Sequence, residues 1–377
     1  MNQFIIKKVA GFLSATAMAI SLIGCSGEVV QPSPREALLG RLKEAAGSYT
    51  FFYAHQDDLV YGHTWRVKDT EGDPLLRSDI RSVCGYFPAI VGFDLGGIEL
   101  GSPENLDGVP FDLIRRAAVT HSERGGIVTF SWHPRNPLTG GDAWDVSSDK
   151  VVESVLPRGA RSEDFALWLS RLGEFLGSIV DSSGEPVPFI FRPWHENIGS
   201  WFWWGGGLCT ASQYKDLYMM TVDYLRGDCA LDNILYAYSP NSGVTPAQYM
   251  ERYPGDDYVD ILGTDHYEYV GEGGNLPEAD ENYVKTLRSE LGNLSTLAVE
   301  HGKVMVLSET GYEGIRNPRW WTEVLLPVVK EYPIAYLLTW RNAHDKPTHF
   351  YAPFPGSGDA EDFYRFAMDP ATLFLEK

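Results

Sequence analysis

The sequence predicts an α/β fold, a single (β/α)8 TIM barrel, on three observations. Short apolar runs recur about every 40 residues, and most are continuously apolar, as parallel strands buried on both faces are. Amphipathic segments alternate with these runs, as in repeated strand–helix units. No glycine-rich turn follows the first run, although a doubly wound nucleotide-binding sheet would need one. The eight expected strands are 51–55, 89–94, 127–132, 187–194, 234–239, 260–265, 304–308 and 335–340.

The segments between these strands supply the expected outer helices. Ser162 or Glu163, and Thr210, are suitable residues at helix starts. Long connections at 96–110, 134–161 and 197–208 follow the second, third and fourth strands, and in this fold such loops surround the active site. The expected helices are 111–124, 163–180, 212–225, 281–301 and 319–330.

The N-terminal residues are expected to be a targeting segment. Lys7 and Lys8 precede 16 uncharged residues, 9–24, too few for a comfortable membrane span. The stretch ends Leu22-Ile23-Gly24-Cys25, which resembles the lipobox of bacterial lipoproteins, where Cys25 would receive lipid. The alternative is an ordinary secretory signal. We expect a signal peptide at 1–24, a tether at 25–34 and one barrel domain at 35–377, exported and lipid-anchored to a bacterial membrane, on its periplasmic side or at the cell surface.

Charge and cysteine content narrow the classes of partner. With 31 Lys and Arg against 51 Asp and Glu, the net charge is −20, which argues against nucleic acid and against electrostatic docking on anionic lipid. Cys84, Cys209 and Cys229 are expected to be small buried thiols, because a helix about 25 Å long separates the last two. Acidic clusters, including that around Asp280, are expected to face solvent.

Two glutamates stand at matching strand ends, where barrel enzymes carry their catalytic groups. Glu196 follows the fourth strand and Glu309 the seventh, 113 residues later. Glycoside hydrolysis needs two carboxyl groups beside the scissile bond, one protonated and one ionised. At a separation of about 5–5.5 Å the second can attack the sugar directly and retain its configuration.

The segment from Phe191 to Gly205, FRPWHENIGSWFWWG, closely resembles the acid/base segment of glycoside hydrolase family 26, mainly β-mannanases. Leu307-Ser308-Glu309-Thr310-Gly311 resembles its nucleophile strand, and Ser131-Trp132-His133-Pro134 and Asp265-His266-Tyr267 are also similar. The resemblance extends from about residue 51 to the C-terminus. It implies a retaining endo-β-1,4-mannanase that hydrolyses mannan, glucomannan, galactomannan or manno-oligosaccharides.

Matching positions imply the role of each site residue. Glu196 is the expected general acid and later base, and Glu309 the expected nucleophile. The acid needs a raised pKa, and we expect Trp194 and Trp201 to supply desolvation. Tyr267 is expected to donate a hydrogen bond to Glu309. The substrate-binding residues expected around this pair are His133, His195, Trp201, Tyr267, Trp340 and Trp144.

The tryptophans among these residues are expected to act as surfaces for sugars, because an indole face covers the C–H groups of a pyranose. Trp201 and Trp340 are the main candidates, and Trp144 is expected on the leaving-group side. Trp320 and Trp321 are assigned to the core, Arg192 to an ion pair inside the barrel, and His266 to the outer side of its strand. Acid–base and nucleophilic chemistry implies no cofactor and no metal.

Three alternatives remain open. The same family contains β-1,3-xylanases and mixed-linkage β-glucanases, which differ in how they hold the 2-hydroxyl group. A non-catalytic, lipid-anchored glycan-binding protein would keep the aromatic surfaces without needing both carboxylates. A metal-dependent barrel hydrolase would usually have His-x-His at the end of the first strand, where only His55 stands.

Overall fold

The computed structural model describes residues 31–67, 77–270 and 274–375. The chain divides into two compact units, Met1–Pro32 and Ser33–Lys377, and the described helices and strands belong to the second. The expected signal peptide and Cys25 lie outside the described residues. Helix α1 begins at Pro34, capped by Ser33, so the last residue of the expected tether is helical. Among the described residues, no helix has the length and hydrophobicity needed to cross a bilayer.

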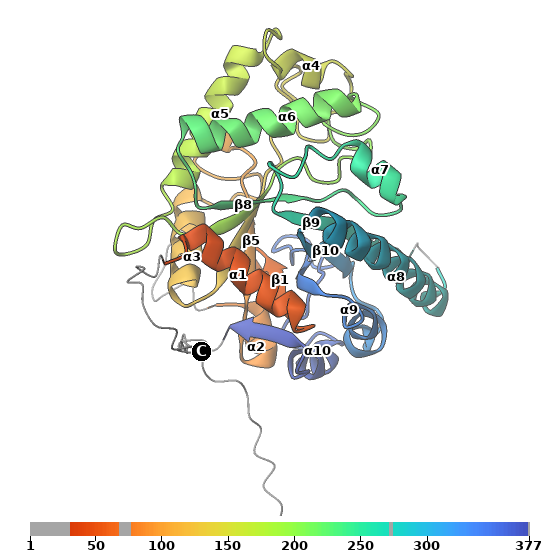
Figure 1. Cartoon of the computed structure of the whole chain (residues 1–377). Helices are drawn as coiled ribbons and strands as arrows, with labels where there is room; N and C mark the ends of the chain where they lie inside the picture. Colours follow the sequence, from red (N-terminus) through yellow and green to blue (C-terminus); the bar gives the residue numbers. More distant parts are fainter. Residues whose placement is uncertain (1–30, 68–76, 271–273, 376–377) are drawn as a thin grey trace, which may run out of the picture. The chain divides into compact units, whose positions relative to one another are not determined.

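Eight parallel strands form a closed barrel (Figure 1). Each lies at one of the expected apolar runs; seven contain all or most of the run, and the fourth contains half of 187–194. Neighbouring strands pair in chain order, and the last pairs with the first, with Tyr53 beside Leu337, which closes the ring. The predicted fold is therefore confirmed. The strands are β1 (Phe51–Gln56), β5 (Ile90–Asp94), β6 (Ile127–Ser131), β7 (Phe189–Arg192), β8 (Ile234–Tyr238), β9 (Ile261–Glu268), β10 (Val304–Tyr312) and β11 (Ile334–Thr339).

Helices surround this barrel, and the five expected ones all form. They are α3 (Phe111–Glu123), α5 (Ser162–Gly177), α6 (Ala211–Asp223), α8 (Leu276–His301) and the continuous η4 (Trp320–Leu325) and α9 (Leu326–Val329). The additional elements are α1 (Pro34–Gly47), β2 (Tyr61–Gly62), β3 (Trp65–Arg66), α2 (Asp79–Cys84), β4 (Phe87–Pro88), η2 (Ile98–Leu100), α4 (Val151–Val155), η3 (Tyr224–Asp228), α7 (Pro246–Glu251), α10 (Ala360–Ala367) and β12 (Thr372–Leu375).

Helix α1 closes the N-terminal end of the barrel. Leu38 and Leu42 pack against aliphatic side chains at the beginnings of the strands, such as Ile90, Ile127 and Ile261. In Figure 1 this helix crosses in front of β1 and β5. Because one end is plugged by apolar side chains, ligands have access to the barrel only from the C-terminal ends of the strands, where catalytic groups gather in this fold.

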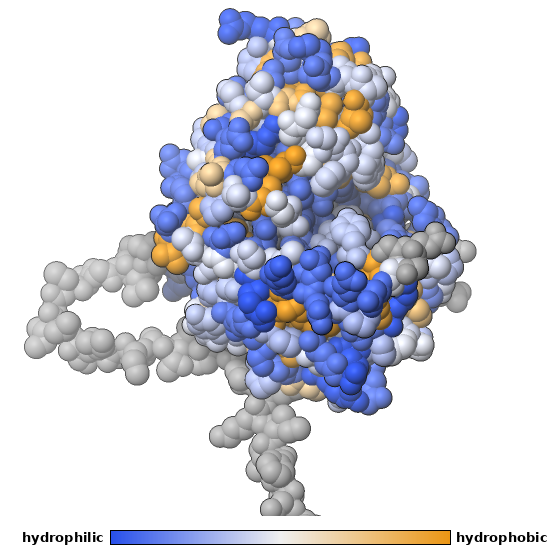
Figure 2. Space-filling view, turned by 90° about the vertical axis from the view of Figure 1, so that its right-hand side faces the viewer, coloured by the Kyte–Doolittle hydropathy of each residue, from blue (hydrophilic) through white to orange (hydrophobic). Residues whose placement is uncertain are grey.

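The outer faces of the strands pack against the helices. Trp320 and Trp321 are fully buried in this layer, as expected. Cys84, Cys209 and Cys229 are free thiols, but only Cys84 is buried and the other two are half-buried. The face shown in Figure 2 is mostly hydrophilic with separate hydrophobic patches, as expected for a chain whose apolar side chains fill its core.

Candidate active site

A cavity of about 420 Å³ lies at the C-terminal ends of the barrel strands. Its lining combines carboxyl, imidazole and aromatic side chains, a composition that suits a sugar better than an apolar ligand. The eight residues predicted for the site all line it: His133, Trp144, His195, Glu196, Trp201, Tyr267, Glu309 and Trp340.

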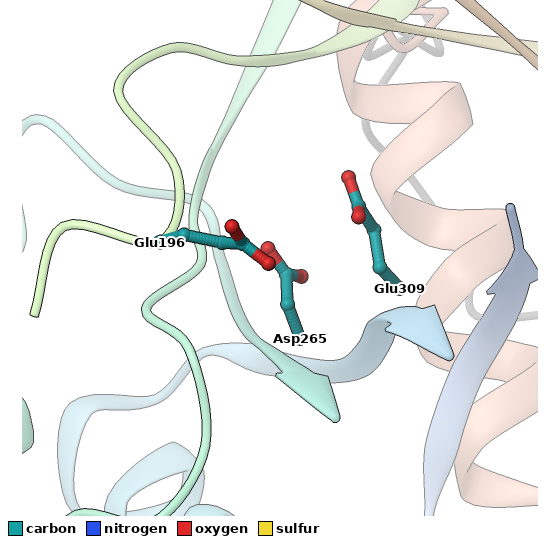
Figure 3. A group of neighbouring side chains, drawn as sticks. All are labelled: Glu196, Asp265 and Glu309. Atoms are coloured by element: carbon teal, nitrogen blue, oxygen red, sulfur yellow. The ribbon is translucent and has the colours of Figure 1, made fainter. Parts of the chain in front are cut away.

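The barrel brings Glu196 and Glu309 together across this cavity, as the sequence predicted. Single carboxylate oxygens of Glu196, Asp265 and Glu309 all lie within 4.8 Å of one another (Figure 3). Glu309 lies on β10, whereas Glu196 lies beyond β7 and has a left-handed backbone with φ of 52°. Its N–H donates to the carbonyl of Ser239 at 2.8 Å. Such a conformation is uncommon outside glycine and is characteristic of functional sites held in place by their surroundings.

Arg192 neutralises part of the charge of these carboxyl groups. Its guanidinium is 1% exposed and donates from Nη2 to Oε1 of Glu309 at 2.6 Å. Its Nη1 lies 3.7 Å from Oδ2 of Asp265, which confirms that Arg192 pairs inside the barrel. Burial alone would lower the pKa of Arg192, but Glu309 and Asp265 raise it above its usual value. Three carboxyl groups at this spacing can ligate a cation, yet here a guanidinium already supplies positive charge to two of them.

Asp265 is a buried acid whose importance was not predicted. The hydroxyl groups of Ser308 and Ser239 donate to it at 2.6 and 3.0 Å. Burial, followed by the charge of Glu309, raises the pKa of Asp265 well above the usual carboxyl value. The alternation of side chains along β9 could have indicated this, because Asp265 and Tyr267 must point to the same face. His266 points the other way and contacts Thr286 of α8, as expected.

The two glutamates have different surroundings, which suit an acid and an anion respectively. Burial raises the pKa of Glu196 to about 7, and the charge of Glu309 contributes to the rise. Glu309 instead accepts hydrogen bonds on both oxygens, from Arg192 and from the Tyr267 hydroxyl, the latter at 2.7 Å. One carboxyl can therefore hold a proton near neutral pH while its neighbour is stabilised as a carboxylate.

The two tryptophans expected to desolvate Glu196 lie in different surroundings. Trp194 is fully buried beneath the site and donates to the hydroxyl of Thr221, so it belongs to the core. Trp201 is 42% exposed and donates from Nε1 to Oε2 of Glu196 at 2.7 Å. The hydrogen bond from Trp201 lowers the pKa of Glu196 and so acts against the rise that burial causes.

Two histidines with opposite electrostatic surroundings lie in the cavity, with ring centroids 4.6 Å apart. Nδ1 of His133 lies 2.6 Å from a carboxylate oxygen of Asp94. Burial would lower the pKa of His133, but Asp94 raises it. Burial and the neighbouring His133 and Arg192 lower the pKa of His195 well below its usual value. The surroundings therefore favour the protonated form of His133 and the neutral form of His195. Asp94 is the last residue of β5, and the sequence indicated no role for it.

Aromatic side chains form the remaining walls. Trp144, 48% exposed, stacks on His133 with centroids 5.3 Å apart and an angle of 11°. Trp340 meets His133 edge-on at 6.3 Å. Tyr351 lies against Gly311, where a Cβ would come within 2.6 Å of the phenol ring and where φ is 148°. Glycine at this position therefore allows an aromatic ring to pack directly beside the strand that carries Glu309.

A second pair of acids lies at the edge of the cavity. Glu268 is 5% exposed and accepts a hydrogen bond from Trp320 at 2.6 Å. Burial and the adjacent Asp280 raise the pKa of Glu268 to about 8, against the lowering effect of Trp320. Asp280 was expected in solvent, but it is half-buried and accepts from Asn317 at 2.8 Å. The contact between Asp280 and Glu268 depends on the approach of α8 to β9. No local pattern in the sequence reveals this approach.

Comparison with known proteins gives a consistent result. The model of glycosyl hydrolase family 26 matches residues 46–306. A mannan endo-1,4-beta-mannosidase of Bifidobacterium adolescentis is 31% identical over 339 residues, which are 85% of this chain and 33% of that protein. One from Bacillus subtilis is 30% identical over 203 residues, 50% of this chain and 52% of the relative. The chain therefore spans about a third to a half of the length of these relatives.

Solved structures agree over a larger share of both chains. A GH26 beta-mannanase from Bacteroides ovatus has a TM-score of 0.85 and 44% identity, covering 91% of this chain and 96% of that one. An endo-beta-1,4-mannanase from Cellulomonas fimi has a TM-score of 0.79 and 32% identity, covering 91% of this chain and 76% of that one.

The pair of Glu268 and Asp280 predicts a specific dependence of stability on pH. Because the pKa of Glu268 is raised from 4.5 to about 8 on folding, the folded state retains a proton that the unfolded state releases. Glu268 therefore makes the free energy of unfolding fall as pH rises from about 5 to about 8. Asp280→Asn removes the adjacent carboxyl and should reduce this fall by roughly 1 kcal/mol.

Urea unfolding at pH 5.5, 7 and 8.5 measures this effect, with the exposed Asp149→Asn as the matched control. The same pH dependence in the wild type and in Asp280→Asn would contradict the assignment.

Proposed function

The chain belongs to glycosyl hydrolase family 26, and from this premise we propose that it is a retaining endo-β-1,4-mannanase. The observation that carries the proposal is the approach of one carboxylate oxygen of Glu196 to within 4.8 Å of one of Glu309, inside a cavity lined by carboxyl, imidazole and aromatic side chains. This separation suits direct attack on the sugar rather than attack through an interposed water, which needs about 6.5–9.5 Å. The mannanases among the relatives and the solved structures support mannan as the substrate.

In the first step, a carboxylate oxygen of Glu309 attacks the anomeric carbon. Glu196 gives its proton to the glycosidic oxygen, the bond between that oxygen and the anomeric carbon breaks, and the leaving sugar chain departs with a new hydroxyl group. The two partners of Glu309 keep its carboxylate in position, since Tyr267 holds one oxygen and Arg192 the other. The product is a sugar linked to Glu309 through an ester.

In the second step, Glu196, now ionised, removes a proton from water. The water oxygen bonds to the anomeric carbon, and the carboxylate of Glu309 leaves. Two inversions restore the original configuration. His133, His195 and Trp340 are proposed to bind the sugar attacked by Glu309, through hydrogen bonds to its hydroxyl groups and contact with its C–H face. Trp201 and Trp144 are proposed to contact the leaving side.

We also propose that the protein is exported and anchored through lipid on Cys25. The support is the resemblance of Leu22-Ile23-Gly24-Cys25 to a lipobox. An enzyme held in this way would act on glycans outside the cytoplasm. In a bacterial host that lipidates such cysteines, Cys25→Ser should move the protein from the membrane fraction to the soluble fraction, and unchanged membrane association would contradict the anchor.

The proposed activity is tested by incubation with unsubstituted mannan, galactomannan, β-1,3-xylan and mixed-linkage β-glucan. We expect oligosaccharides from the two mannans, with early products of several lengths because cleavage is internal. Folded protein that cleaves none of these polymers would overturn the proposal. Preference for xylan or glucan would assign the chain to another activity of its family.

Replacing either glutamate should remove most activity on mannan. Glu309→Ala lacks the nucleophile. Glu196→Ala lacks the proton donor, whose contribution is typically about 10²–10⁴-fold. The two variants differ on an aryl mannobioside with a strongly acidic phenol as leaving group, which departs without protonation. Glu196→Ala should release about one equivalent of that phenol in a rapid burst and then turn over slowly, because the second step lacks its base, whereas Glu309→Ala should show no burst. Initial rates measure both effects, and near wild-type activity of either variant on mannan would refute its assigned role.

The hydrogen bond from Trp201 should be visible in the pH profile of kcat/KM. Because the proposed first step needs protonated Glu196, whose pKa is about 7, activity should decline above neutral pH. Trp201→Phe keeps an aromatic ring but removes the N–H that favours the carboxylate, so the pKa of Glu196 should rise. The alkaline limb should then move to higher pH, by up to about one unit. A limb that stays in place or moves to lower pH would contradict this role of Trp201.

A further inference from the structure

The last residues of β9 and those that follow alternate between the barrel and the outer helices. Asp265 and Tyr267 point toward Glu309, whereas His266 and Glu268 contact Thr286 of α8 and Trp320 of η4. Tyr269 follows Glu268 and continues the inward series, and it lines the same cavity as the two catalytic candidates. Tyr269 thus adds a second phenol to the cavity wall, just beyond the end of β9.

Tyr269 differs from the other tyrosines near the site because nothing in the described chain covers it. Its side chain is 86% exposed, more than any other large hydrophobic or aromatic residue described. Within the described residues it makes no hydrogen bond and no ring contact. By contrast, Tyr267 donates to Glu309 and packs edge-on against Tyr351 at 5.5 Å. An uncovered aromatic ring on the wall of a polar cavity is suited to contact a ligand.

Tyr269 lies at the open part of the cavity that contains Glu196, because it lines that cavity and is largely exposed. Tyr269 shares the lining of the cavity with Glu196 and Trp201. Glu196 is the group that must reach the oxygen between the two sugars at the point of cleavage. Side chains next to Glu196 and open to solvent therefore border the leaving sugar. Trp201, which donates to Glu196, is one of them, and Tyr269 approaches from a different loop.

We propose that the ring of Tyr269 is a specificity-determining surface that covers the sugar on the leaving-group side of the scissile bond, together with Trp201. This inference rests on the proposed glycosidase function and deepens it. The two rings come from the connections after β7 and β9, so they border that sugar from separate elements. Contact between the ring and the C–H groups of a pyranose needs no charge and adds binding energy only when a sugar occupies that position.

This location has a consequence that separates Tyr269 from a residue that merely supports the fold. A manno-oligosaccharide has a sugar as leaving group, and that sugar would touch Tyr269 in the first step. In β-mannobiosyl fluoride the leaving group is one small atom: the C–F bond breaks, fluoride departs with the bonding electrons, and a carboxylate oxygen of Glu309 bonds to the anomeric carbon. The value of kcat/KM reports events up to this first irreversible step. The ratio of kcat/KM on the oligosaccharide to kcat/KM on the fluoride therefore isolates the contribution of contacts with the leaving sugar.

The experiment measures kcat/KM on mannotetraose and on β-mannobiosyl fluoride for the wild type, Tyr269→Ala and Tyr269→Phe. For Tyr269→Ala we expect a loss of about three- to tenfold on mannotetraose and a change of less than about twofold on the fluoride. Tyr269→Phe keeps the ring and should remain within about twofold of the wild type on both. The matched control is Tyr364→Ala, which removes a 47% exposed tyrosine from α10 and should change neither value.

Several outcomes would overturn the inference. Equal losses on both substrates would mean that Tyr269 supports the fold or the general site. An unchanged value on mannotetraose in Tyr269→Ala would mean that the ring does not contact the leaving sugar. If kcat/KM on mannotetraose fell as much in Tyr269→Phe as in Tyr269→Ala, the hydroxyl group and not the ring would be responsible. Failure of the proposed function has a different signature, because the wild type itself would then leave mannotetraose intact.

Discussion

The buried guanidinium of Arg192 is the interaction on which the site depends. Three carboxyl groups lie within 4.8 Å of one another at the end of the barrel, and three negative charges at that spacing would repel one another strongly in a poorly solvated environment. Arg192 donates to Glu309 and lies close to Asp265, but Glu196 has no such partner. Arg192 therefore gives Glu309 a direct cationic partner, whereas burial and the charge of Glu309 raise the pKa of Glu196.

The rest of the arrangement follows from this unequal distribution. Glu309 accepts from Arg192 and Tyr267, which suits a nucleophile that must remain charged. Burial and the charge of Glu309 raise the pKa of Glu196 to about 7, which suits a group that first donates and later accepts a proton. Asp265, held by two serine hydroxyl groups, keeps Arg192 in place from the other side. The two histidines also differ in their surroundings. The ring of His133 contacts the carboxylate of Asp94, whereas that of His195 has no such contact within the described residues.

Much of the fold and of the set of site residues was predictable from the sequence, because both depend on periodic or local signals. Buried parallel strands are continuous apolar runs, and their C-terminal ends identify the site residues. Strand boundaries were less predictable: β10 continues to Tyr312, beyond the apolar run, because Glu309 to Tyr312 pair with β9. Helix α1 was not predicted, although Ser33 and Glu36 form a capping box that could have indicated it. The contact of Asp280 with Glu268, and the burial of Trp194 against α5 and α6, depend on tertiary packing that has no local signature.

The central claim is that two carboxyl groups are close enough for one to attack the sugar while the other protonates the departing oxygen. The stereochemistry of the first product tests it most directly. Proton NMR of a manno-oligosaccharide digest, recorded before the anomers equilibrate, should show the new reducing end in the β configuration, because two inversions at the anomeric carbon restore it. Initial formation of the α anomer would mean a single displacement by water, and would contradict the mechanism drawn from this geometry.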